Sequence, residues 1–166
     1  MIDWLTRSAE TRNLLNPSFC SILLWSAARG YAEQSRKKAL PFEIAFLILP
    51  IVLHRETREA LPRSQRTSIA AWVDENQLVR SHITERSRLL VPFTREALLF
   101  GGLYGVLKFS GSEVLGANEW DKKISETINA CSAEIKECVK KAEFIGKWFA
   151  KTGNASTVMA LLGVKP

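Results

Sequence analysis

The side chains that most often carry out chemistry are few in this chain of 166 residues. It has two histidines, His54 and His82, and three cysteines, Cys20, Cys131 and Cys138. These residues form no His-x-x-His or Cys-x-x-Cys pair, so their spacing does not support a metal site. Cys20 stands in an apolar segment, where a cysteine packs more often than it acts as a nucleophile. We therefore predict no catalytic residue, no metal site and no cofactor, and a protein that is not an enzyme.

The densest run of charges is HRETREALPRSQR, residues 54–66. Its carboxylates, Glu56 and Glu59, have neighbouring arginines, and this spacing is typical of ion pairs on a helix surface. The planar guanidinium of arginine suits the binding of carboxylates or phosphates, so the run could be a docking surface for a partner. It could equally be a solvated helix end, where the helix dipole favours cations. The candidate docking residues are Arg55, Arg58, Arg63 and Arg66, together with Trp4, which we expect to be an exposed aromatic anchor.

The composition is that of an ordinary globular protein, with 46% hydrophobic and 24% charged residues and a net charge of +6. We expect one domain over residues 1–166 with a core of its own. Acidic and basic residues are interleaved along the chain, a pattern typical of a solvated surface. The N-terminal segment MIDWLTRSAE lacks the basic and apolar regions of a secretory signal, and the cysteines fit a reducing compartment. We therefore expect a cytoplasmic protein.

The most apolar stretch is residues 40–53. It is shorter than the roughly 20 apolar residues that span a membrane, so we predict a core helix over residues 42–61, kinked at Pro50. It should pack against a helix that begins at Asn16 and Pro17, because these residues are strong helix-start signals. The side chains that we expect to be buried there are Phe42, Phe46, Leu49 and Leu53. A further helix should follow, capped by Ser64.

The C-terminal half gives clearer patterns. Two apolar segments around Ser110-Gly111-Ser112 predict a hairpin over residues 106–115. Apolar residues then recur every three or four positions from Trp120 to Phe149, which predicts one continuous helix over residues 119–152. The whole pattern predicts a mainly α fold: a single compact helical domain with one short β-hairpin and a long C-terminal amphipathic helix. The order helix, helix, hairpin over residues 64–117 also matches a winged-helix-like module.

Several motifs occur in an order found in a known family. They are NPSFCSILLWSAARGY from residue 16, LPFEIAFLILPIVLHRETREALPRS from residue 40, LVPFTREALLFG from residue 90, and IGKWFAKTGNASTVMALLGVKP from residue 145. On these motifs the chain resembles the middle component of bacterial three-component ABC systems, the family that includes the small subunit of Lamassu anti-phage defence. The matching positions are packing residues, so the resemblance carries over no catalytic residue.

The resemblance implies a small non-enzymatic subunit that works beside an SMC- or Rad50-like ABC ATPase and an effector, often a nuclease. Such a subunit would bridge the ATPase heads or hold the effector inactive, and it would meet DNA through the ATPase or by weak contacts of its own, away from any membrane. The alternative is a winged-helix DNA-binding regulator with Arg80, Arg86 and Arg88 on its recognition helix. Phosphate contacts would then make its affinity fall steeply with salt.

Overall fold

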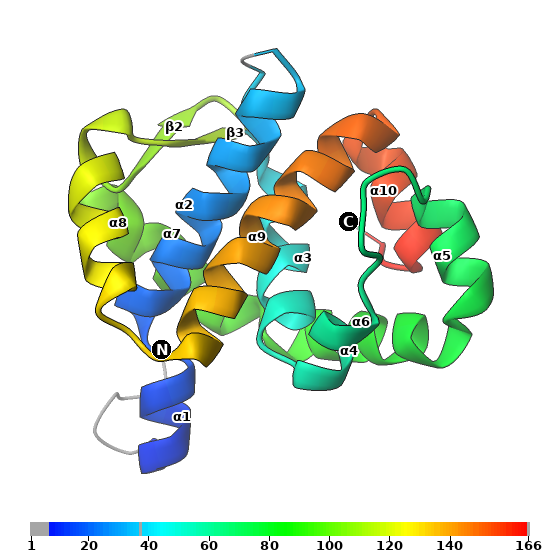
Figure 1. The fold of residues 1–166 in the computed structure, drawn as a ribbon, viewed down its shortest axis with the longest axis horizontal. Helices are drawn as coiled ribbons and strands as arrows, with labels where there is room; N and C mark the ends of the chain where they lie inside the picture. The colour runs from blue at the N-terminus through cyan, green and yellow to red at the C-terminus, as the bar shows by residue number, and fades with distance from the viewer. Residues whose placement is uncertain (1–6, 37, 166) are drawn as a thin grey trace.

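The centre of the fold is a crossing of two helices that lie far apart in the sequence, α2 (Pro17–Gln34) and α9 (Ala133–Thr152). The side-chain oxygen of Asn16 accepts a hydrogen bond from the Ser18 N–H at 2.9 Å, which starts α2 as the sequence predicts. The two helix backbones lie in contact at Gly30 and Gly146, where any side chain would overlap the backbone of the opposite helix. Figure 1 shows α2 and α9 side by side in the middle of the molecule.

The computed structural model describes residues 7–36 and 38–165, and their fold is mainly helical, as predicted. Around the central pair lie shorter helices and one small sheet (Figure 1). The other elements are α1 (Ala9–Leu14), β1 (Leu40–Pro41), α3 (Phe42–Val52), α4 (Arg55–Ala60), α5 (Ile69–Glu75), α6 (Gln77–Leu89), α7 (Val91–Leu103), β2 (Leu107–Ser110), β3 (Glu113–Gly116), the 3₁₀ helix η2 (Asn118–Trp120), α8 (Asp121–Asn129) and α10 (Ala155–Leu162).

The predicted hairpin is confirmed as β2 and β3, joined by a turn in which Gly111 has a φ of 58°. Glycine suits this turn because it adopts positive φ without a steric penalty. The sequence pattern did not reveal β1, which has only two residues and pairs antiparallel with β3, with Leu40 opposite Val114. The sheet order is β1-β3-β2, so a strand that follows α2 lies beside the hairpin that follows α7.

The apolar stretch forms the core helix α3, whose residues from Ile44 to Val52 are buried except Phe46. The predicted kink lies elsewhere, because α3 continues through Pro50 and ends at Val52. A new helix, α4, begins where the His54 ring nitrogen Nδ1 accepts a hydrogen bond from the Thr57 N–H. The prediction that Phe42 is buried is wrong, since 38% of its surface is exposed. None of the helices in the described part of the chain combines the length and apolarity needed to cross a lipid bilayer.

The predicted helix over residues 119–152 is in fact divided into α8 and α9. Tight turns at Ala130 and Cys131 end α8, and the hydroxyl of Ser132 accepts a hydrogen bond from the Ile135 N–H to start α9. The apolar stripe continues across the break because α8 folds back and buries Ile124 in the same core. The predicted ending is confirmed, since α9 stops at Gly153, which has a φ of 116°.

Candidate functional site

The four arginines of the charged run 54–66, which we name the arginine cluster, differ in how far they are buried. Arg58 is only 2% exposed, so the prediction that it joins an exposed docking patch is wrong. Its Nη1 donates to the carbonyl oxygen of Val52 at 2.7 Å, and its Nη2 lies 3.3 Å from a carboxylate oxygen of Glu134. A second carboxylate, that of Glu137, lies 3.7 Å from its Nε. Arg58 therefore joins α4 to the first turns of α9 and is covered by the subunit itself.

The other three arginines of the cluster are exposed, as predicted. Arg55 forms an ion pair with Glu59, one turn later on α4, with its Nε 2.8 Å from the carboxylate. Arg63 and Arg66 lie on the connection between α4 and α5, which we name the arginine segment (residues 61–68). Within residues 7–36 and 38–165, neither has a carboxylate within ion-pair distance. These two charges are therefore available to an acidic partner. Trp4, the expected aromatic anchor, lies outside the described residues.

The arginine segment has no helical structure of its own, yet its backbone is bound to the rest of the fold. The indole N–H of Trp148 on α9 donates to the carbonyl oxygen of Thr67 at 2.7 Å. The ammonium group of Lys151 donates to the carbonyl oxygen of Gln65 at 3.0 Å. The indole N–H of Trp72 donates to the carbonyl oxygen of Ala60, directly before the segment, at 2.7 Å. These bonds fix the segment against α9, so Arg63 and Arg66 extend from an ordered backbone.

A second surface, which the sequence reading missed, lies along α7. Leu99 and Leu103 are 68% and 81% exposed, although they stand in a strongly apolar helix. With Phe42 and Phe109 they border a groove of about 450 Å³, which we name the α7 groove. Its lining residues are Phe42, Arg95, Leu98, Leu99, Gly102, Leu103 and Phe109. The available signal was the double leucine at residues 98 and 99, because adjacent residues of a helix cannot both face one neighbour.

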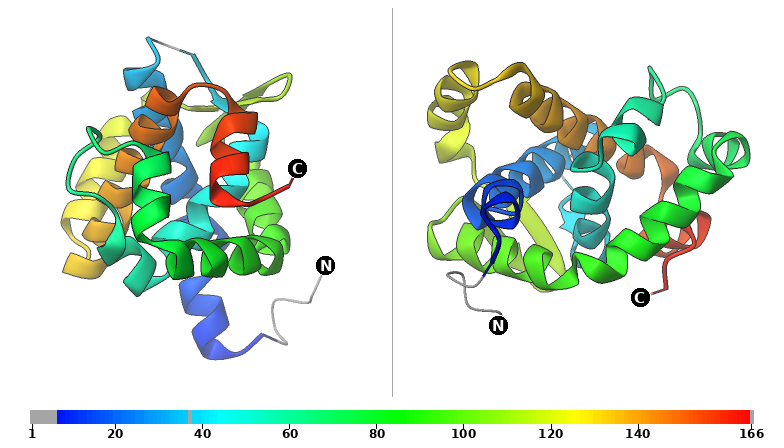
Figure 2. Two further views of the ribbon diagram at one scale, coloured as in Figure 1. Left: turned by 90° about the vertical axis from the view of Figure 1, so that its right-hand side faces the viewer. Right: turned by 90° about the horizontal axis from the view of Figure 1, so that it is seen from below.

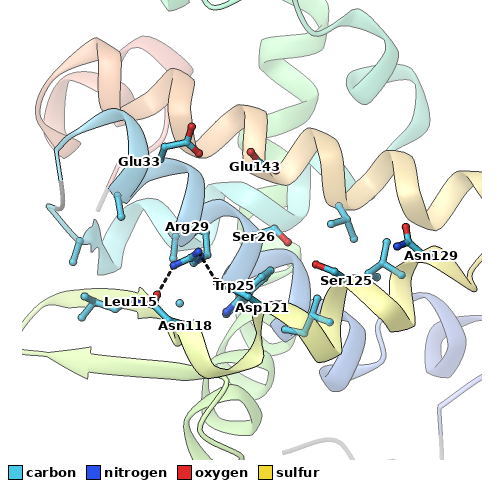
Figure 3. Close-up of a pocket in the computed structure, with 17 residues that line it drawn as sticks. Trp25, Ser26, Arg29, Glu33, Leu115, Asn118, Asp121, Ser125, Asn129 and Glu143 are labelled. Carbon is cyan, nitrogen blue, oxygen red and sulfur yellow. Dashed lines mark hydrogen bonds and ion pairs between the residues drawn. The ribbon is translucent and has the colours of Figure 1, made fainter.

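A third feature is a cleft of about 930 Å³ between α2, α8, α9 and β3 (Figure 3). Arg29 of α2 lies inside it and binds the side-chain oxygen of Asn118 and, at 2.8 Å, a carboxylate oxygen of Asp121. Where α2 faces α9, Glu33 of α2 and Glu143 of α9 both bind the ammonium group of Lys147. The charges of this cleft are thus largely paired with one another. They hold η2 and α8 against α2, and they form no pair of a nucleophile with a base.

The histidines and cysteines do not assemble a reactive site. Burial raises the pKa of the Cys20 thiol to about 12, and it also raises the pKa of Cys138. Burial and the nearby Arg86 lower the pKa of His54, whose ring caps α4. Among the described side chains, no group of three or more His, Cys, Asp or Glu residues could hold a metal ion.

One comparison with known proteins identifies the family. A family model described as "ABC-three component (ABC-3C) system Middle Component 3" matches residues 4–166. The chain belongs to this family. Neither a curated protein nor a solved structure matches it. The predicted resemblance to the middle component of three-component ABC systems is thereby confirmed, and a middle component acts in a system that has further components.

In this middle component the two exposed surfaces lie on opposite sides. The right-hand view of Figure 2 shows α7 at the lower left and the arginine segment, in green, at the upper right. The central helices α2 and α9 lie between them (Figure 1). One surface is apolar, and the other carries the charges of Arg63 and Arg66, which have no carboxylate of the described residues within ion-pair distance.

Proposed function

We propose that this middle component is a non-enzymatic adaptor of an anti-phage defence complex of the Lamassu type. It bridges an SMC- or Rad50-like ABC ATPase and an effector, often a nuclease, in the cytoplasm. The observation that carries the proposal is the pair of unlike surfaces on opposite sides of the fold, in a chain that belongs to the family of ABC-3C middle components. An adaptor needs two such surfaces, whereas an enzyme needs a reactive site.

The energetics of the α7 groove favour a partner. Covering a leucine side chain of this exposure contributes about 1.5 to 3 kcal/mol, and Leu99 and Leu103 stand side by side. A long-lived exposed apolar surface also promotes non-specific association, so monomeric proteins seldom keep one without a use. The arginine segment complements the groove, because exposed charges speed association and select the partner more than they add affinity.

The proposal is tested by co-expression with the proteins encoded beside this chain, which should yield a stable complex. Arg63→Glu/Arg66→Glu should weaken that complex about tenfold at low salt and less at high salt, because the charges are exposed. The fold should be unchanged. A matched control is Lys38→Glu/Arg88→Glu, which alters the net charge equally at exposed positions away from the segment. Arg58→Glu should instead destabilise the subunit itself, because it places a buried carboxylate beside Glu134 and Glu137.

Two results would contradict the proposal. If the double variant of the arginine segment assembles and protects cells as well as the parent, the segment is a solvated connection with no docking role. If the parent never co-purifies with the product of an adjacent gene, the adaptor proposal itself fails.

A second candidate function, a winged-helix DNA-binding regulator, is favoured by the sheet. The strand β1, which follows α2, pairs with the hairpin of β2 and β3, which follows α7. The resulting strand order β1-β3-β2 suits a winged-helix-like module. The charges oppose it. Arg86 is half-buried and donates to the Pro50 carbonyl and the Thr57 hydroxyl, and Arg80 donates to the Ala160 carbonyl, so of the three predicted recognition arginines only Arg88 is exposed. The helix before the hairpin exposes leucines where phosphate contact needs cations. Absence of DNA binding by the isolated protein at low salt would remove this candidate.

A further inference from the structure

We infer that the α7 groove binds an amphipathic α-helix of a partner subunit, with large apolar side chains one turn apart and an aspartate or glutamate that pairs with Arg95. This inference rests on the proposed adaptor function and adds the chemistry of one partner. Grooves of this kind recognise helices through apolar anchors spaced three or four residues apart.

The spacing along α7 sets the shape of the partner. Arg95, Leu99 and Leu103 follow one another at intervals of four residues, so they form one line on the helix surface. That line is about 12 Å long, because each residue of a helix advances the chain by about 1.5 Å. Two turns of a partner helix cover this length, and ridges of residues four apart pack well against a second helix.

The walls of the groove explain where the partner's apolar side chains would lie. Phe109 comes from the hairpin and Phe42 from the start of α3, and both stand partly exposed beside the leucines. The hairpin lies directly on α7, because a side chain at Gly102 would meet the Phe109 ring at 2.8 Å. Leu98 is buried and contributes to the floor. The groove is therefore open along its length and bordered by aromatic rings that can adjust to the side chains of a helix.

The charge of the groove selects the partner's chemistry. Arg95 is exposed at its edge and, among the described residues, has no carboxylate within ion-pair distance. The adjacent Glu96 is bound to Arg7, with an oxygen 2.8 Å from the guanidinium. A partner that covers the groove removes water from Arg95, which is costly unless a carboxylate replaces that water. We therefore expect the carboxylate to come from the partner.

The same charge disfavours a second copy of this chain as the occupant. In a symmetric contact the same surface is used on both sides, so each Arg95 would have to find its carboxylate within the α7 groove of the other copy. The lining of the groove contains no acidic residue to supply it. A nucleic acid is disfavoured for a different reason, since the remaining lining residues are apolar and offer phosphates no further cation.

The first test uses the complex purified after co-expression of the full chain with the proteins encoded beside it. Leu103→Lys should raise the dissociation constant about thirtyfold or more, since it places a charge against the partner's apolar face. Leu78→Lys is the matched control, because Leu78 is 79% exposed but lies on α6, outside the groove. Arg95→Glu should raise the dissociation constant about tenfold, and Arg95→Lys should do so less. Arg88→Glu, at an exposed position of α6, should leave the affinity unchanged.

The second test identifies the occupant. A photo-crosslinking amino acid at position 99 in the purified complex should attach to one helical segment of the partner. In that segment an acidic residue should lie about one turn from the crosslinked site, and its replacement by lysine should restore binding to the Arg95→Glu variant.

The outcomes separate this inference from the proposed function. If the complex forms but tolerates both Leu103→Lys and Arg95→Glu, the inference is wrong while the adaptor function stands. If only Leu103→Lys weakens it, the acidic partner helix is wrong. If the isolated chain dimerises and Leu103→Lys abolishes the dimer, the occupant is a second copy and the inference is overturned. If no complex forms with the parent chain, the adaptor function is what fails.

Discussion

The α2–α9 crossing and the α7 groove are both built from apolar helices, yet they differ in how far their apolar side chains are exposed. Around the crossing, Leu23, Leu24 and Phe149 are fully buried. In α7, Leu98 is 4% exposed and its neighbour Leu99 is 68% exposed. The difference teaches that apolar composition alone does not tell a core helix from a binding helix. What decides is whether a second element of the same chain covers the face.

Glycines sharpen the contrast, because both regions contain glycines at close contacts. At Gly146 a side chain would overlap the Ala27 carbonyl oxygen and approach the Tyr31 nitrogen, both backbone atoms. At Gly102 it would meet the edge of the Phe109 ring, a side chain that is partly exposed and can rotate. The crossing is therefore rigid at the level of the backbone, whereas the groove can adjust.

The largest effect should come from Gly146→Ala. Because the added methyl group has no room between two helix backbones, we expect the free energy of unfolding to fall by about 3 kcal/mol or more. Gly102→Ala should cost under about 1 kcal/mol, since the Phe109 ring can move aside. Denaturant unfolding followed by tryptophan fluorescence measures both. Equal losses for the two variants would contradict the distinction between a rigid crossing and an adjustable groove.

The next effect compares neighbouring leucines of α7. Leu98→Ser should lower the free energy of unfolding by about 3 kcal/mol, because it removes buried apolar atoms and leaves a hydroxyl in the core. Leu99→Ser should change it by no more than about 0.5 kcal/mol, since the parent side chain is already in water. Thermal unfolding of the isolated subunit gives the comparison. A large loss of unfolding free energy for Leu99→Ser would mean that another part of this chain already covers the α7 groove.

The smallest perturbation is chemical labelling of the thiols. Cys20 lies on α2 with no exposed surface, and its raised pKa keeps it protonated at pH 8, so it should not react with iodoacetamide. Cys138 is also buried, whereas Cys131 is partly exposed at the junction of α8 and α9. Mass spectrometry of the native protein should therefore find rapid labelling at Cys131. Rapid labelling of Cys20 would show that the crossing opens far more readily than its packing implies.

Features set by local chemistry could be predicted from the sequence. Asn16 and Pro17 start α2, Ser110-Gly111-Ser112 turns the hairpin, and Gly153 ends α9, because a cap or a turn depends on a few adjacent residues. The break between α8 and α9 was missed because both helices bury the same apolar stripe. The local signal, Ser132 as a cap, was weaker than the periodicity around it.

Features set by distant elements could not be predicted. Arg58 resembles its neighbour Arg55 in the sequence, and it is buried only because the carboxylates of α9 arrive beside it. Leu99 and Leu103 have the pattern of core residues, and the double leucine at residues 98 and 99 does not tell which of the two faces lacks a neighbour. Two-residue strands such as β1 depend entirely on the partner strand, here β3. Of the two candidate surfaces, the exposed Arg63 and Arg66 were therefore predicted, whereas the α7 groove was missed.

The α2–α9 crossing also sets the order of events during synthesis. The ribosome releases the chain from its N-terminus, so α2 and the apolar α3 emerge long before α9. The helix α7 and the hairpin, which pack on one side of α2, become available first. The other side of α2, with Gly30, stays uncovered until Gly146 and the rest of α9 have left the ribosome. A nascent chain of this protein thus passes through a period in which one side of α2 is exposed to water.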